Sequence, residues 1–189
     1  MALSFLPDAD LTLDVVVTCD PAVVATDEQA EAYLLSGDVN DLGGYEGATI
    51  FTLKALSPSD REAAEVKAGA YTRSELGRML WVEAPEEPKA KARWHHELAE
   101  DEREALALYQ SYLNKVFVEM VNVALIKIDG EEAKGKVDLI KPESHRLQVI
   151  SELVQHIQRM SLLGQAGKKR SPPLFGLPTA EAVEGAVTN

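Results

Sequence analysis

Four histidines and a single cysteine have the most specific chemistry among the side chains of this sequence. His96 and Glu100 are four residues apart, as are Glu152 and His156, and this spacing places each pair on one face of a helix. Each pair can supply two ligands to a metal ion, whereas a structural or catalytic zinc site needs three or four. No HExxH-type spacing supplies the others. The sequence therefore predicts neither a native metal site nor a cofactor.

The sequence also contains no motif that is typical of nucleophilic catalysis. Cys19 follows a β-prone run with no basic group near it in sequence, which predicts a partly buried residue at a strand end rather than an activated thiolate. The glycine cluster 43–47 lacks the Lys and Ser/Thr of a phosphate-binding loop, and no GxSxG nucleophile elbow is present. The carboxylates are too numerous for one pair to stand out as acid and base. We therefore expect a protein that is not an enzyme.

The net charge of −12 is unevenly distributed. Residues 1–53 contain no Lys or Arg and ten carboxylates: Asp8, Asp10, Asp14, Asp20, Asp27, Glu28, Glu31, Asp38, Asp41 and Glu46. Such a segment repels phosphate backbones, which argues against a nucleic-acid ligand. Two interpretations remain, a docking surface for a basic partner and a solvated face, and the pattern favours the second.

The remaining composition indicates a cytoplasmic protein. No run approaches the ~18–20 apolar residues that a membrane-spanning helix needs. The N-terminus lacks the basic and apolar regions of a secretory signal. One cysteine cannot form an internal disulfide, which fits a reducing compartment.

The local patterns predict two strands and several helices. Residues 11–18 and 49–54 are rich in β-branched or apolar residues and read as strands that can pair with each other. The sequence Ser57-Pro58-Ser59-Asp60 is a helix start with a hydroxyl cap, and Ser74 lies in a second start signal. Either one kinked helix or two short helices satisfy these signals.

The second half of the chain is predicted to contain the longest helices. Residues 85–93, PEEPKAKAR, are predicted to be a charged linker, and a long amphipathic helix is predicted from about Trp94 to Ala124. Residues 125–128 either extend this helix or form a strand, with residues 137–140 as a hairpin partner. Pro142 is predicted to open the last helix and Gly164 to end it.

These patterns predict a mainly α fold of the α+β class, a helical domain with a small N-terminal β element. We divide the chain into an acidic arm with one strand (1–47), a helical domain (48–165) and a mobile C-terminal tail (166–189). Wide apolar helix faces serve cores and interfaces equally well, so homo-oligomer formation stays open.

Five large apolar residues are candidates for contacts with a partner protein: Trp81, Trp94, Leu174, Phe175 and Leu177. The two tryptophans flank the predicted linker, where a core anchor is the more common role of such a residue. The other three lie in the otherwise polar tail. A segment of this kind either docks into a partner's groove or folds back on its own domain.

The order of these elements resembles one protein family. The stretch TIFTLKALSPSDREAAE (49–65) joins an apolar strand, a Leu-Ser-Pro cap and an acidic–basic helix. A long helix then ends in an apolar run (117–128), a short acidic insert follows, and IKPESHRLQVISELVQHIQRMSLL (140–163) leads to a lysine-rich exit. Residues 49–165 thus resemble the tail assembly chaperones of long-tailed bacteriophages. The acidic arm has no counterpart in this resemblance.

The resemblance implies a small, acidic, helical protein that is not an enzyme. Members of this family coat the hydrophobic helices of the tape-measure protein until tail-tube subunits replace them. The implied partners are the tape-measure and tail-tube proteins, and the implied location is the cytoplasm of the infected bacterium. Two other functions stay open. One is a structural subunit of the virion, such as a head–tail or tail accessory protein, and the other is a host-directed phage inhibitor.

Overall fold

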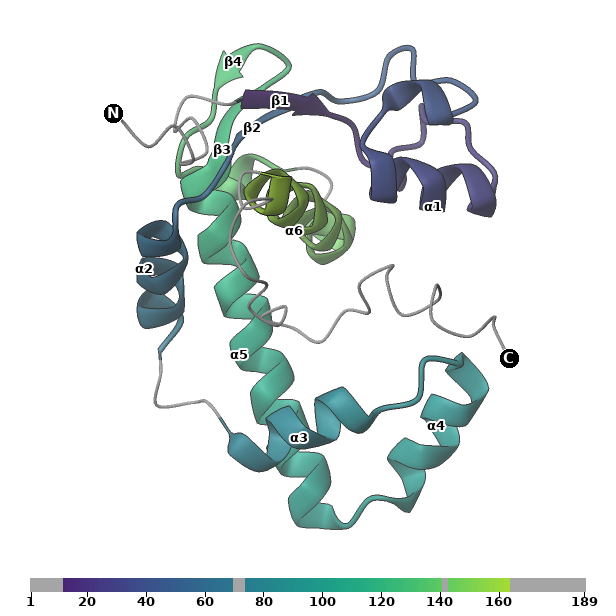
Figure 1. Cartoon of the computed structure of the whole chain (residues 1–189), viewed down its shortest axis with the longest axis vertical. Helices are drawn as coiled ribbons and strands as arrows, with labels where there is room; N and C mark the ends of the chain where they lie inside the picture. The colour runs from purple at the N-terminus through teal and green to yellow at the C-terminus, as the bar shows by residue number, and fades with distance from the viewer. Residues whose placement is uncertain (1–11, 70–73, 141–142, 164–189) are drawn as a thin grey trace, which may run out of the picture. The chain divides into compact units, whose positions relative to one another are not determined.

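The structure is a computed structural model that describes residues 12–69, 74–140 and 143–163 (Figure 1). Its elements in chain order are β1 (Thr12–Val15), α1 (Asp27–Ser36), η1 (Val39–Asp41), β2 (Phe51–Lys54), α2 (Pro58–Ala68), α3 (Glu75–Glu83), α4 (Pro88–Glu97), α5 (Glu100–Ala124), β3 (Leu125–Ile128), β4 (Glu131–Glu132), η3 (Val137–Leu139), η4 (Glu143–His145) and α6 (Arg146–Leu163). The η elements are short 3₁₀ helices. The mainly helical α+β class predicted from the sequence is confirmed.

The four strands form one antiparallel sheet in the order β1-β2-β3-β4. The two strands predicted near the N-terminus do pair, with Thr12 opposite Lys54 and Val15 opposite Phe51. Residues 125–128 form a strand, and its hairpin partner is β4 rather than residues 137–140, which lie in and next to η3. The hairpin turn uses Asp129 and Gly130, both with positive φ, as a two-residue turn of this kind requires.

The predicted start of α2 is confirmed at atomic detail. Ser57 Oγ accepts a hydrogen bond from the Asp60 amide at 3.1 Å, and the Asp60 carboxylate accepts one from the Ser57 amide at 3.1 Å. Pro58 occupies the first helical position, where its missing N–H costs nothing. The second start signal opens a separate helix, because Ser74 caps α3 by accepting from the Gly77 amide at 3.0 Å.

Two predictions for residues 85–124 are wrong. The predicted linker 85–93 is largely helical, since Glu87 accepts from the amides of Lys89 and Ala90 and starts α4 at Pro88. The predicted long helix is interrupted at Leu98 and Ala99, where the Glu102 carboxylate accepts from the Ala99 amide at 2.8 Å. This cap starts α5 without any glycine or proline.

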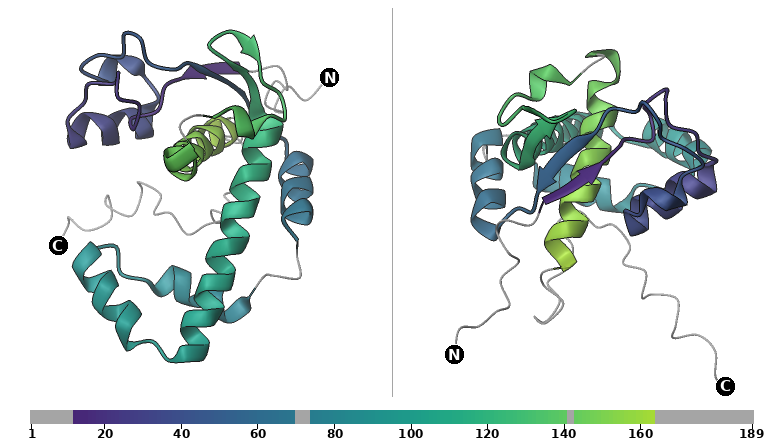
Figure 2. Two further views of the ribbon diagram at one scale, coloured as in Figure 1. Left: turned by 180° about the vertical axis from the view of Figure 1, so that it is seen from behind. Right: turned by 90° about the horizontal axis from the view of Figure 1, so that it is seen from above.

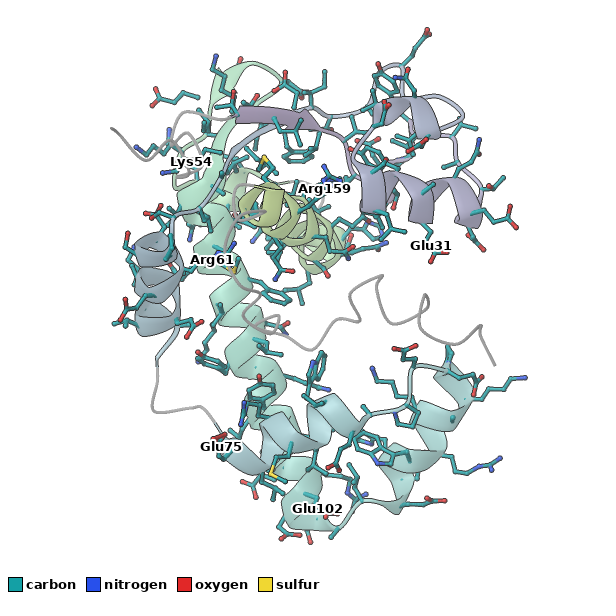
Figure 3. All side chains as sticks on the ribbon, in the orientation of Figure 1. Glu31, Lys54, Arg61, Glu75, Glu102 and Arg159 are labelled. Carbon is teal, nitrogen blue, oxygen red and sulfur yellow. The ribbon has the colours of Figure 1, made fainter. Side chains whose placement is uncertain are left out.

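The acidic residues 22–47 and their glycine cluster predict a long surface loop with one helical turn near residues 27–35, but the structure has a full helix, α1, there. Thr26 and Gln29 form a capping box at the start of α1, and Gly37 ends the helix in the left-handed conformation at φ +73°. Arg159 of α6 points toward this end of α1 (Figure 3) and donates to the carbonyls of Tyr33 and Leu34. The positive φ favours glycine at position 37, whereas the Arg159 guanidinium that a Cβ atom would meet is the end of a flexible side chain and can move.

The described residues form two compact units, one from the residues before Thr72 together with those from Ser111 to Gly167, and the other between Arg73 and Gln110. In the first unit, α6 lies against one face of the sheet (Figures 1 and 2). The spacing of Leu147, Ile150, Val154, Ile157 and Ser161 predicts one stripe along α6 that faces inward. The last four residues are buried, whereas the Leu147 side chain is 61% exposed. No helix among the described residues is long and apolar enough to cross a membrane.

Candidate protein-binding face

The second unit has a small core of its own. Leu80 of α3, Leu98 and Leu106 are buried together, and Trp81 and Trp94 pack against them. The Trp81 ring lies at an interplanar angle of 59° to the Tyr109 ring, with 6.5 Å between centroids. The ammonium group of Lys91 stands 5.4 Å from the centre of Trp81, within the range of a cation–π contact. Both tryptophans thus help to fix α3 and α4 against α5.

Gly77 allows α3 and α5 to approach closely. A Cβ atom at this position would overlap the backbone carbonyl of Ala105 and lie 2.7 Å from the Cβ of Tyr109. These neighbours belong to the backbone and to the base of a side chain, which cannot rotate away. Gly77 therefore fixes which face of α3 meets α5.

The opposite face of α3 carries a second apolar stripe that is exposed. Leu76, Met79 and Val82 follow one another at three-residue steps and are 41%, 55% and 65% exposed. We call these three residues the α3 stripe. Isolated exposed apolar residues are normal in proteins, whereas an aligned run on one helix face is typical of a protein-binding surface. The α3 stripe is therefore the candidate site in the described part of the chain.

Sequence reasoning found part of this site. The apolar pattern of the sequence places Leu76, Met79 and Leu80 on one face of the helix. In the structure Leu80 faces inward, while the other two face outward. The signal that separates the two faces is Gly77, because only the side without a Cβ can meet a neighbouring helix so closely. Of the predicted contact residues, Trp81 and Trp94 lie partly buried in this unit, and Leu174, Phe175 and Leu177 lie outside the described residues.

The structure does not place either of the two His–Glu pairs as part of a metal site. His96 and Glu100 do not share a helix, because α4 ends at Glu97 and α5 begins at Glu100. The Glu152 carboxylate accepts from the amide and the hydroxyl of Thr18, at 2.6 and 2.9 Å. Across residues 12–69, 74–140 and 143–163, no group of three His, Cys, Asp or Glu side chains is placed to hold a metal ion.

His156 is fully buried in the first unit. Its ring centre lies 5.0 Å from that of Tyr33, and neither ring nitrogen has a hydrogen-bond partner within the described chain. Burial, reinforced by the positive charge of Arg159, lowers the pKa of His156 to about 4. The imidazole is therefore neutral at pH 7 and belongs to the packing of α6 against α1.

The Cys19 thiol lies close to the Glu152 carboxylate. Burial, followed by the charge of Glu152, raises the pKa of this thiol to about 12. A thiol with such a pKa is protonated at neutral pH and is a poor nucleophile. The side chain is partly buried, as predicted, but it lies in a turn four residues after the end of β1 rather than at the strand end.

A shallow groove of about 510 Å³ lies between α2 and α5 in the first unit. Its polar lining includes Lys67, Ser111, Lys115 and Glu119, and the Lys67 ammonium is 3.8 Å from the Glu119 carboxylate. Ion pairs with this exposure contribute little to stability or binding. We assign no chemistry to this groove.

A scan against protein-family models, a search of curated proteins and a search of solved structures each found no match for this chain.

Proposed function

We propose that this chain is a tail assembly chaperone of a long-tailed bacteriophage, a protein without enzymatic activity that binds apolar helices of the tape-measure protein. The observation that supports this proposal is the α3 stripe, in which Leu76, Met79 and Val82 project from a helix whose other face is already packed. A partner helix with an apolar stripe of its own can cover these three side chains.

The energetics suit a reversible complex. Covering one half-exposed side chain of this size contributes about 1 kcal/mol, because full burial is worth about 1.5–3 kcal/mol. The stripe stands on a helix held by Gly77 and Leu80, so little conformational entropy is lost when a partner binds. A chaperone needs binding of this moderate strength, since tail-tube subunits must later displace it.

The proposal is tested by mass spectrometry of purified phage particles together with a pull-down of the tagged chain from infected cells. We expect the chain to be absent from particles and the pull-down to contain a long helical tape-measure protein. Presence in particles at a fixed copy number would overturn the proposal in favour of a virion subunit. Normal particles and a captured bacterial enzyme would overturn it in favour of a host-directed inhibitor.

A further inference from the structure

β1 is an edge strand of the sheet. The strand order places β2 on one side of β1, and no described residue pairs with its other side. An edge of this kind presents unpaired N–H and C=O groups that another strand can bind. The question is which groups of β1 are available and what kind of strand fits them.

Tyr33 identifies the outward-pointing groups. Its hydroxyl accepts from the Val16 amide at 3.1 Å and donates to the Val16 carbonyl at 3.0 Å, so both groups of Val16 point away from β2. Backbone groups of alternate residues point to the same side of an antiparallel strand, which places those of Asp14 and Thr12 outward as well. Among the described residues, the edge is thus closed by Tyr33 at Val16 and unpaired at Asp14 and Thr12.

A side-chain contact supports this assignment. Thr52 Oγ1 donates to the Asp14 carboxylate across the β1–β2 pair at 2.6 Å. Side chains approach more closely at pairs whose backbone groups do not bond each other, so this contact is typical of a residue whose N–H and C=O face the other way. Two independent observations therefore place the backbone of Asp14 on the open edge.

The charge around this edge indicates which kind of strand can bind to β1. Residues 12–53 contain eight carboxylates and no Lys or Arg, and both Asp14 and Glu31 are exposed. The nearest base along the chain is Lys54, which lies opposite Thr12 on β2; Lys54 and Glu31 are labelled in Figure 3. A second copy of β1 in antiparallel pairing would bring two Asp14 side chains to the same short ladder, where like charges repel. Residues 1–11 carry Asp8, Asp10 and no base, so they meet the same repulsion. A strand with Lys or Arg opposite Asp14 is attracted instead.

We propose that the open edge of β1 binds an extended, basic segment of a partner protein, which adds to the sheet as a strand. The segment carries Lys or Arg on the face of Asp14 and apolar residues on the face of Leu13 and Val15. Its backbone bonds to the outward groups of Thr12 and Asp14, and the Tyr33 hydroxyl ends the added ladder. This site lies in the first unit and does not involve the α3 stripe, so it goes beyond the proposed function.

The experiment measures binding of the full chain to a fluorescent peptide with alternating lysine and valine, and to matched peptides with glutamate or proline in place of lysine. We expect the lysine peptide to bind and the other two to bind at least tenfold more weakly, roughly the effect of losing a pair of ladder bonds or an ion pair. Equal binding of the lysine and glutamate peptides would overturn the proposal.

Two variants of Asp14 separate the contribution of its backbone N–H to binding from the contribution of its charge. Asp14→Pro removes an outward N–H that the sheet does not use and is expected to abolish binding, whereas Asp14→Asn keeps the backbone and is expected to weaken it several-fold. Glu31→Gln on α1 is the matched control for charge and is expected to bind nearly as the wild type does. Wild-type binding by Asp14→Pro would contradict the proposal.

Two further results would assign the edge to another occupant and would also overturn the proposal. One is a wild-type dimer in sedimentation that Asp14→Pro converts to a monomer, which identifies a second copy. The other is peptide binding that occurs only after residues 1–11 are deleted, which identifies the amino-terminal segment of the same chain. Circular dichroism and urea unfolding of each variant check that the fold is retained.

Discussion

Replacing Gly77 with alanine is expected to destabilise the second unit by about 3 kcal/mol, at the upper end of the usual cost of overpacking. The new methyl group would overlap the Ala105 carbonyl and crowd the Tyr109 Cβ, so α3 must move away from α5. The sign of the change in unfolding free energy distinguishes a close helix contact from an ordinary helix position. At an unconstrained helix position the same substitution stabilises by about 1 kcal/mol, because alanine has the higher helix propensity.

Tryptophan fluorescence during urea unfolding measures this effect selectively, because both tryptophans of the chain, Trp81 and Trp94, lie in the second unit. The midpoint is expected to fall for Gly77→Ala. The matched control is Arg78→Ala, at the neighbouring exposed position, where an exposed pair with Glu75 is lost and the expected change is below about 0.5 kcal/mol. A Gly77→Ala variant as stable as this control would show that the close contact between α3 and α5 is absent in solution.

The second large effect is expected at His156. Because its folded-state pKa is about 4 and the ordinary value is 6.5, the unfolded chain binds one more proton between these two pH values. The free energy of unfolding therefore falls as the pH decreases through this window, by about 3 kcal/mol in total, and this loss is complete near pH 4. Above pH 6.5 the histidine is neutral in both states and contributes no pH dependence.

His156→Leu isolates this contribution. Leucine removes two buried nitrogens without partners, so the variant is expected to be more stable than the wild type at pH 7 by about 1 kcal/mol, and by more at pH 4.5. The measurement is urea unfolding followed by circular dichroism at several pH values. The matched control is His96→Gln, which removes an exposed histidine on α4 that takes no part in the packing around His156. A difference between His156→Leu and the wild type that does not grow toward low pH would refute the burial of a neutral His156.

Local signals account for what the sequence predicted correctly. The capping box of Ser57 and Asp60 involves residues three apart, and the β1 and β2 strands are marked by their own β-prone residues. The class of the fold follows from such elements. The interruption at Ala99 was missed because its cap is a glutamate side chain with no glycine or proline beside it.

The candidate site depended on tertiary contacts that the sequence does not display. Leu76, Met79 and Leu80 are all apolar, and their hydrophobicity cannot tell which of them meets α5. The burial of His156 against Tyr33 joins residues that are far apart in the chain, so a histidine four residues after Glu152 looked like half of a metal site. In both cases the missing information was the identity of the packing neighbour.

We propose that the α3 stripe binds an apolar partner helix, and the most direct measurement is calorimetric titration of the full chain with helical fragments of a phage tape-measure protein, the partner that the proposed function names. The variant Leu76→Gln, Met79→Gln, Val82→Gln is expected to stay folded, because these side chains are exposed, and to bind about a hundredfold more weakly. The control Lys89→Gln, Arg93→Gln, Glu97→Gln changes exposed charged positions of α4 instead and is expected to bind as the wild type does. Equal affinity of the stripe variant and this control would contradict the claim.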